Sequence, residues 1–149
     1  LVVWKKYKRG EYDYMSPEQF RELLRELGRG LRLGSYGDPA CVPFEVWQSI
    51  GVGSGEFNHT SYTHGYLLPD FDTRNLDVSM VSLDPTMPEL PAWLDGRSFR
   101  VIAAPNQVRP DEILCPASKE QNYKTTCAKC GLCAGLNRKA KNIAIVMHG

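Results

Sequence analysis

A series of short apolar segments, separated by helical or irregular stretches, restricts the fold of this chain more than any other feature. The segments recur at intervals of about 12 to 30 residues, which is typical of βαβ units. The sequence therefore predicts one α/β domain over residues 1–149, built as a partial (β/α) barrel or an open, mainly parallel sheet. The expected strands are 31–39, 58–66, 77–85, 98–105, 112–116 and 142–149. The expected helices are 16–30, 42–55 and 86–96.

The segment 16–30 carries the clearest helix pattern. Ser16 is a candidate N-cap, Pro17 follows at the first helical position, and Gly28 or Gly30 supplies the end. Between these residues, apolar side chains recur at helical spacing. They are Phe20, Leu23, Leu24 and Leu27.

Charge and hydropathy exclude a highly charged or membrane-spanning protein. Eighteen basic and seventeen acidic residues leave a formal charge of +1, so no global field favours nucleic acid or an anionic membrane. No apolar run approaches the roughly 18 residues that span a bilayer, and the N-terminus lacks the apolar centre of a secretory signal. We therefore expect an intracellular protein without membrane contact. The first residue is Leu1 rather than methionine, so we expect a processed product or a part of a longer protein.

Several expected strands end on a polar residue followed by proline or glycine. Asp38, His64 and Asp84 occupy such positions. Because the carboxyl ends of parallel strands meet at one edge of a sheet or barrel, these three side chains are candidates for binding a small polar ligand, with Tyr36 and Tyr62 beside them. The alternative is turn formation alone, for which Asp-Pro and His-Gly are common sequences.

Four of the five cysteines form a C-x11-C-x2-C-x2-C array within a loop at 115–135. They are Cys115, Cys127, Cys130 and Cys133. Disulfides are disfavoured inside cells, and closely spaced cysteines in one loop pair poorly with each other, so the array predicts a metal site. Cys41 stands apart and is expected to be a small buried apolar residue.

Two metals compete for these four thiolates. The C-x2-C-x2-C triad with a remote Cys115-Pro116 favours a [4Fe–4S] cluster, although the remote cysteine precedes the triad. Zinc is the alternative, because Cys127–Gly131 resembles a zinc knuckle, yet structural zinc sites more often use two separated C-x2-C pairs.

The loop also carries a run of basic side chains. They include Lys124, Lys129, Arg138, Lys139 and Lys141. Cations lower the free energy of a negatively charged metal–thiolate site. The same residues could contact nucleic acid or a partner protein, and a solvated basic face is the third interpretation.

The remaining motifs do not indicate a catalytic or nucleotide-binding site. No nucleophile–histidine pair has recognisable flanking residues, and the glycines of 51–55 lack the strand-before, helix-after setting of a dinucleotide loop. The sequence leaves open whether the chain is an enzyme. Trp4, Trp47 and Trp93 lie on or beside helical segments and are expected to pack in the interior.

Four stretches, "LRLGSYGDPACVPFEVW", "TSYTHGY", "SFRVIAAP" and "ILCPASKEQNYKTTCAKCGLC", together resemble the gene-product-88 family of uncharacterised phage and bacterial proteins. The resemblance covers most of the chain and implies a short form or the C-terminal half of a longer protein. It also implies the cytoplasm of a bacterium or a phage-infected cell, and an architecture similar to the partial barrel of radical S-adenosylmethionine enzymes.

The cysteine spacing departs from that enzyme class. Radical enzymes use a C-x3-C-x2-C motif near the start of the chain and leave one iron open, whereas this triad comes late and has a fourth cysteine available. A cluster with four cysteine ligands has no open iron, so we expect it to be structural, auxiliary or electron-transferring. The second hypothesis is a zinc-stabilised module that binds nucleic acid or protein.

Overall fold

The computed structural model of the protein describes residues 2–83 and 89–147. The four helices of this part are α1 (Val2–Lys8), α2 (Pro17–Leu27), α3 (Phe44–Ser49) and α4 (Cys127–Cys130). The strands are β1 (Leu31–Arg32), β2 (His59–Thr60), β3 (Tyr62–Thr63), β4 (Met80–Leu83), β5 (Ser98–Ile102), β6 (Glu112–Leu114) and β7 (Asn142–Val146).

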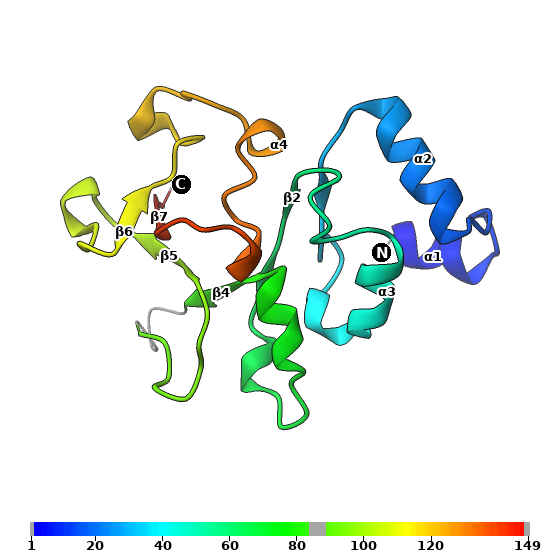
Figure 1. Ribbon diagram of the computed structural model, residues 1–149, viewed down its shortest axis with the longest axis horizontal. Coiled ribbons are helices and arrows are strands. Elements are labelled where there is room, and N and C mark those ends of the chain that lie inside the picture. The colour runs from blue at the N-terminus through cyan, green and yellow to red at the C-terminus, as the bar shows by residue number, and fades with distance from the viewer. Residues whose placement is uncertain (1, 84–88, 148–149) are drawn as a thin grey trace.

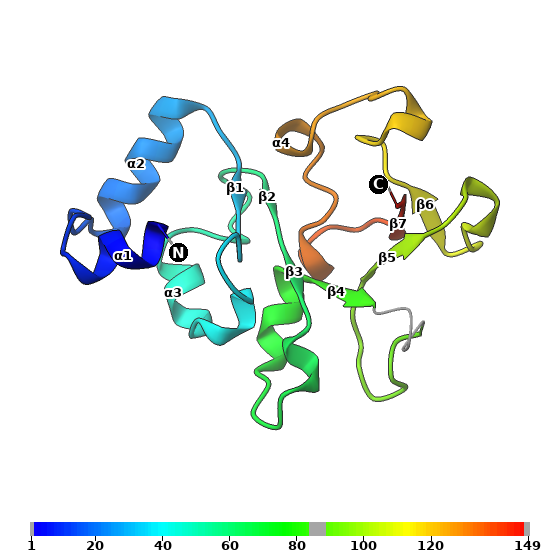
Figure 2. The same ribbon diagram turned by 180° about the vertical axis from the view of Figure 1, so that it is seen from behind.

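All strand pairs in the structure are parallel, which confirms the predicted mainly parallel α/β sheet. Five strands form one sheet in the order β3-β4-β5-β7-β6, and β1 pairs with β2 in a second sheet. The described strands do not close into a barrel. In both ribbon views the helices α1, α2 and α3 lie on one side of the molecule and β4 to β7 on the other, with α4 between them (Figures 1 and 2).

Ser61 interrupts what would otherwise be one strand, and so joins the two sheets. Its carbonyl accepts a 3.0 Å hydrogen bond from Met80 N, in line with the β3–β4 ladder. Its N–H points elsewhere and donates to the carbonyl of Cys133 at 2.9 Å. The cysteine loop therefore takes the place of a neighbouring strand at this residue, which explains why β2 and β3 are separate elements.

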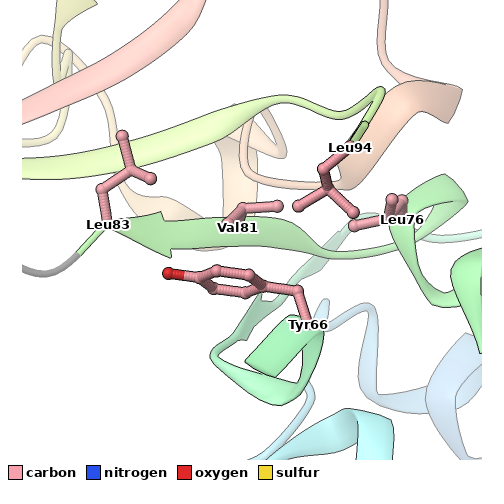
Figure 3. Packing of buried hydrophobic residues seen from close by; sticks show 5 residues of the cluster. All are labelled: Tyr66, Leu76, Val81, Leu83 and Leu94. Carbon is pink, nitrogen blue, oxygen red and sulfur yellow. The ribbon is translucent and has the colours of Figure 1, made fainter. Parts of the chain in front are cut away.

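Three groups of buried side chains stabilise the fold, and alternation along β4 separates two of them. Val81 and Leu83 point to one face, where they pack with Tyr66, Leu76 and Leu94 (Figure 3). Met80 points to the opposite face and packs with Ile143, Cys115 and Cys133. A third group lies between β1, α3 and the segment before β4. It contains Leu33, Phe44, Val52 and Val78.

Helix α2 begins and ends as its sequence predicts. Gln19 N donates to Ser16 Oγ at 3.2 Å, and Ser16 N donates to Gln19 Oε1 at 2.8 Å, so a reciprocal capping box closes the first turn. Gly28 ends the helix at φ 57°, a left-handed conformation that glycine adopts without steric cost.

The helix expected over 86–96 is wrong in its described part. Residues 84–88 lie outside the described ranges, and 89–96 form bends and turns rather than a helix. Pro91 has no N–H to donate within a helix, and its carbonyl instead accepts a turn hydrogen bond from Leu94 N at 2.9 Å. The strand expected over 31–39 is also shorter, because only Leu31 and Arg32 pair and the chain then turns.

The tryptophans divide between interior and surface. Trp47 is half-buried against the α3 cluster, and its Nε1 donates to Pro39 O at 3.0 Å. The expectation of interior packing is wrong for Trp4 and Trp93, which are 55% and 66% exposed. Trp4 stacks on Tyr7 within α1, a helix that buries none of its residues. Helical spacing alone did not distinguish an apolar surface from a core.

No helix among residues 2–83 and 89–147 has the length and apolar character needed to cross a bilayer. This finding agrees with the absence of a long apolar run in the sequence.

His59 makes the stability of the fold depend on pH. The ring is 5% exposed, and Nε2 lies 2.9 Å from Val78 O, to which the neutral ring donates. Burial lowers the pKa of His59 below its ordinary 6.5, while the carbonyl works against this shift. The unfolded chain therefore binds the proton first as pH falls through 6.5, and the folded state loses stability.

We expect the free energy of unfolding to fall by up to about 1.4 kcal/mol per pH unit below pH 6.5 on account of His59. Urea unfolding at pH 7.5, 6.5 and 5.5 measures the slope. His59→Gln should flatten it, whereas His64→Gln, at an exposed position, should not. Equal slopes in the two variants would contradict the assignment.

Candidate metal centre

The four cysteines of the array lie on three short pieces of structure. Cys115 directly follows β6, and its N–H donates to Ala144 O at 2.8 Å, continuing the ladder with β7. Cys127 and Cys130 are the first and last residues of α4, so they share one face of a single helical turn. Cys133 follows three residues later and is held by the Ser61 N–H.

All four cysteines line one small pocket on the Met80 face of the sheet. The pocket brings Cys115 together with the triad 127–133, across a gap of eleven residues in the chain. Tyr62, Thr60 and Ile143 form the rest of its wall toward the sheet. Cys115 and Cys133 are each 8% exposed, Cys130 is half-buried and Cys127 is exposed. The pocket is therefore apolar at its base and open on the side of Cys127.

The cysteines of this pocket form no disulfides and, among the described residues, no group arranged to hold a metal ion. All five cysteines of the chain are free. Within the described ranges, no group of three or more His, Cys, Asp or Glu side chains is arranged to hold a metal ion. The four cysteines thus line one pocket without forming a ready-made metal site.

Burial controls the protonation of the two inner thiols. It raises the pKa of Cys133 to about 11, although the hydroxyl of Tyr62 favours the thiolate. Burial also raises the pKa of Cys115, and the N–H of Ala117 works against that shift. Both groups are neutral thiols at pH 7, so a bound metal cation would have to displace their protons.

Tyr62 is the polar neighbour of the pocket. It lies half-buried against the Cys115–Cys133 cluster, with its ring 4.4 Å from that of Phe99. Burial and then the adjacent Cys133 raise the pKa of Tyr62 far above its ordinary value, so its hydroxyl remains a proton donor. Sequence reasoning placed Tyr62 near the strand-end pocket and did not foresee its contact with Cys133.

Asn58 fixes the turn that carries Cys127 and Cys130. Its Nδ2 donates to Ala128 O at 3.3 Å and to Lys129 O at 3.4 Å, at the C-terminal end of α4. Gly131 then reverses the chain at φ 59°, and a Cβ at this position would lie 2.8 Å from Asn58 Oδ1. The left-handed glycine of the predicted knuckle is therefore present.

The basic residues of the loop are all on the surface. They are Lys124, Lys129, Arg138, Lys139 and Lys141. Lys124 Nζ donates to Gln121 Oε1 at 2.7 Å, and Lys141 Nζ donates to Pro110 O at 2.8 Å. Contact with nucleic acid or a partner protein through these side chains stays a prediction.

Of the three strand-end candidates, two are brought together. Asp38 and His64 line a shallow hollow of about 290 Å³, together with Arg32 and Tyr62. Asp84 lies outside the described residues. The Asp38 carboxylate is engaged by the protein itself, because Oδ1 accepts from Thr63 Oγ1 at 2.6 Å and Oδ2 accepts from His64 N at 2.6 Å. Asp38 thus fastens the loop before α3 to the end of β3.

Replacing Asp38 by alanine should lower the free energy of unfolding by about 2 to 3 kcal/mol, because Ala40 N, Thr63 Oγ1 and His64 N lose a charged acceptor. Urea denaturation measures the loss. Asp72→Ala is the matched control: Asp72 also caps a 3₁₀ turn, but the hydrogen bonds of its carboxylate among the described residues all come from the nearby Arg74. A loss for Asp38→Ala no larger than the control's would leave Asp38 free to act mainly as a ligand.

A wider groove of about 540 Å³ adjoins the cysteine pocket. Its floor is the same face of the sheet, formed by Tyr62, Phe99 and Ile145, and it shares Cys127 with the cysteine pocket. Leu31 and Arg32 of β1 border its other side. A molecule lying in this groove would contact the exposed edge of the cysteine site.

Comparison with known proteins finds no matching family model, no matching curated protein and no matching solved structure. The resemblance to the gene-product-88 family and to radical-enzyme barrels stays a prediction.

Proposed function

We propose that this protein is a metalloprotein that holds a [4Fe–4S] cluster on Cys115, Cys127, Cys130 and Cys133. The observation that carries the proposal is that the four cysteines line one pocket although Cys115 is remote in the chain. Packing in the apolar cluster accounts for the two buried cysteines, Cys115 and Cys133. It does not account for the half-buried Cys130 and the exposed Cys127 at the same pocket.

The C-x2-C-x2-C spacing in the sequence, with the remote Cys115-Pro116, favours a cluster over a single ion. Four thiolates around one Zn²⁺ lie about 3.8 Å apart, since each Zn–S bond is about 2.3 Å. In a [4Fe–4S] cluster each thiolate binds a different iron, so the sulfurs are further apart. The four cysteines line one pocket, and the described residues contain no group of three or more ligands already arranged to hold a metal ion, so the choice of a cluster rests on the cysteine motif.

Four cysteine ligands restrict what the cluster would do. With each iron bound to a protein thiolate, the group supplies one-electron transfer and structural cross-linking rather than an open coordination position. Of the residues that would hold the group, Cys115 and Cys133 are buried and pack with Met80 and Ile143. Cys127 is exposed and lines the groove, so a molecule bound there would lie beside one ligand of the group and could exchange an electron with it.

Anaerobic purification tests the proposal. A brown protein with broad absorption in the visible range and roughly four irons and four sulfides per chain, as expected of a thiolate-bound [4Fe–4S] cluster, would support it. A colourless protein that retains one zinc through gel filtration would contradict the cluster and support the alternative below. A metal-free wild-type protein that keeps its fold would contradict both.

The zinc alternative rests on the turn at 127–131. Two cysteines on one helical turn followed by a left-handed glycine form a knuckle, and the exposed Lys124 and Lys129 lie on the same loop. Such a module would use these cations to bind nucleic acid or an acidic partner protein. Salt-dependent binding of the zinc-loaded protein to a random single-stranded oligonucleotide would favour this function.

A further inference from the structure

Arg97 is a buried cation that pairs with no carboxylate among the described residues. The residue directly precedes β5 and is 6% exposed. Within residues 2–83 and 89–147 it forms no ion pair, unlike Arg100 three residues later, which pairs with Glu112 at 2.6 Å. A buried charge destabilises a fold unless a partner compensates it. An anion close to Arg97 would therefore stabilise the fold.

The guanidinium group is directed at the cysteine loop. Nη1 donates to Leu132 O at 2.7 Å and to Gly135 O at 3.1 Å, the carbonyls on either side of Cys133 and Ala134. Nη2 donates to Lys141 O at 2.5 Å, where the loop rejoins the sheet. The remaining donor, Nε, is buried and has no hydrogen-bond partner among the described residues. Arg97 thus clamps both ends of 132–141.

One group near Arg97, the side chain of Cys133, can carry a negative charge that compensates the guanidinium. Burial lowers the pKa of Arg97, and the like charge of Arg138 lowers it further, while Cys133 acts in the opposite direction. Arg97 Nη1 binds the carbonyls of Leu132 and Gly135, so Cys133 is the cysteine that lies between its two hydrogen-bond partners on the loop. A metal bound to Cys133 would hold it as the thiolate, whose negative charge would compensate the guanidinium.

We propose that Arg97 is the built-in counter-charge of the cysteine site, a positioning residue that stabilises the thiolate of Cys133 and holds the loop that carries it. The inference rests on the proposed metal site and goes beyond it, because it assigns control of the charge of that site to one residue. Reduction of the cluster by one electron from dithionite makes the site more negative by one charge. A fixed cation nearby stabilises the reduced state and raises the reduction potential.

The test compares Arg97→Gln, which removes the charge, with Arg97→Lys, which keeps it. Each is purified anaerobically, matched for iron and sulfide content, and titrated with dithionite while the cluster spectrum is recorded. Arg97→Gln should make reduction at least tenfold less favourable, a shift of about 59 mV for a one-electron couple. Arg97→Lys should shift by well under half of that. If Arg97→Gln cannot retain the cluster, retention by Arg97→Lys alone supports the charge role.

The matched control is the double variant Arg100→Gln, Glu112→Gln. It removes a partly buried arginine together with its partner, from the face of β5 that bears the Arg100–Glu112 pair, and should leave the potential unchanged. Equal potentials in wild type and Arg97→Gln, or equal changes in the glutamine and lysine variants, would overturn the proposal.

If the wild-type protein binds zinc instead of a cluster, the same variants are compared by their affinity for zinc, measured by competition with a chelator. Arg97→Gln should then weaken binding by about 10- to 100-fold, the usual effect of losing a group that supports a ligand, and Arg97→Lys by much less. Equal affinities overturn the role of Arg97 and leave the metal site intact. A wild type that binds neither metal overturns the proposed function itself, together with this inference.

Discussion

Replacing Cys130 by serine is expected to abolish metal binding, with metal content falling at least about tenfold below that of the wild type. Serine is nearly the same size but its hydroxyl does not ionise at neutral pH, so the site loses one of four thiolates. Cys130 is only half-buried and is not a member of the buried core, which keeps the packing cost of the substitution small. Metal analysis after anaerobic purification measures the loss.

The same variant should loosen the end of the chain. If the metal joins Cys115 to the triad, its loss removes the connection between the end of β6 and the loop before β7. Amide exchange should then rise over 112–146 and stay unchanged in α2. Cys41→Ser is the control, because Cys41 is exposed and does not line the cysteine pocket. Equal metal content in the two variants would sink the four-cysteine assignment.

Gly135→Ala should be among the most destabilising single substitutions in the chain. Gly135 has φ 65°, and a Cβ there would lie 2.4 Å from Leu76 O and 2.6 Å from Ser79 N. Both contacts are to backbone, which cannot rotate away as a side chain can. We expect a loss of about 4 kcal/mol or more in the free energy of unfolding, because left-handed strain and steric overlap add.

Gly28→Ala separates these two contributions. Gly28 has nearly the same φ, 57°, but a Cβ there would meet nothing within 4 Å. It should therefore cost only about 1 kcal/mol, the penalty of the left-handed conformation itself. Urea denaturation of the two variants measures the difference. A loss for Gly135→Ala no greater than that for Gly28→Ala would show that the loop does not pack closely against 76–79.

Local patterns predicted the positions of the strands and of α2, but not of α1 or α4. Each described strand lies within an expected apolar segment, although 31–39 pairs only over Leu31–Arg32, and a cap, a proline and a terminal glycine located α2, because these features act over a few residues. The spacing of the cysteines predicted one shared site, and its metal stays a prediction. Helix 86–96 failed because the apolar residues around Pro91 fit a helical pattern that proline does not allow.

Contacts between residues far apart in the chain could not be predicted from the sequence. Nothing in "DGRSF" distinguishes Arg97 from an ordinary turn residue, and its role depends on carbonyls at 132, 135 and 141. The insertion of β7 between β5 and β6 has no local cause either. The sequence identified Asp38 as a residue at a strand end. Only the structure shows that its carboxylate accepts a hydrogen bond from the N–H of His64, the residue that follows β3.

The junction at Ser61 has a consequence for the order in which the chain assembles. The N–H of Ser61 donates a hydrogen bond to Cys133 O, and Asn58 Nδ2 donates to Ala128 O, 70 residues further along the chain. Contacts so distant in sequence close a large loop and are made late. During synthesis, the N-terminal sheet cannot satisfy these groups until the cysteines have left the ribosome. Completion of the sheet and assembly of the cysteine site are therefore one event, which requires the residues up to Cys133 to have been synthesised.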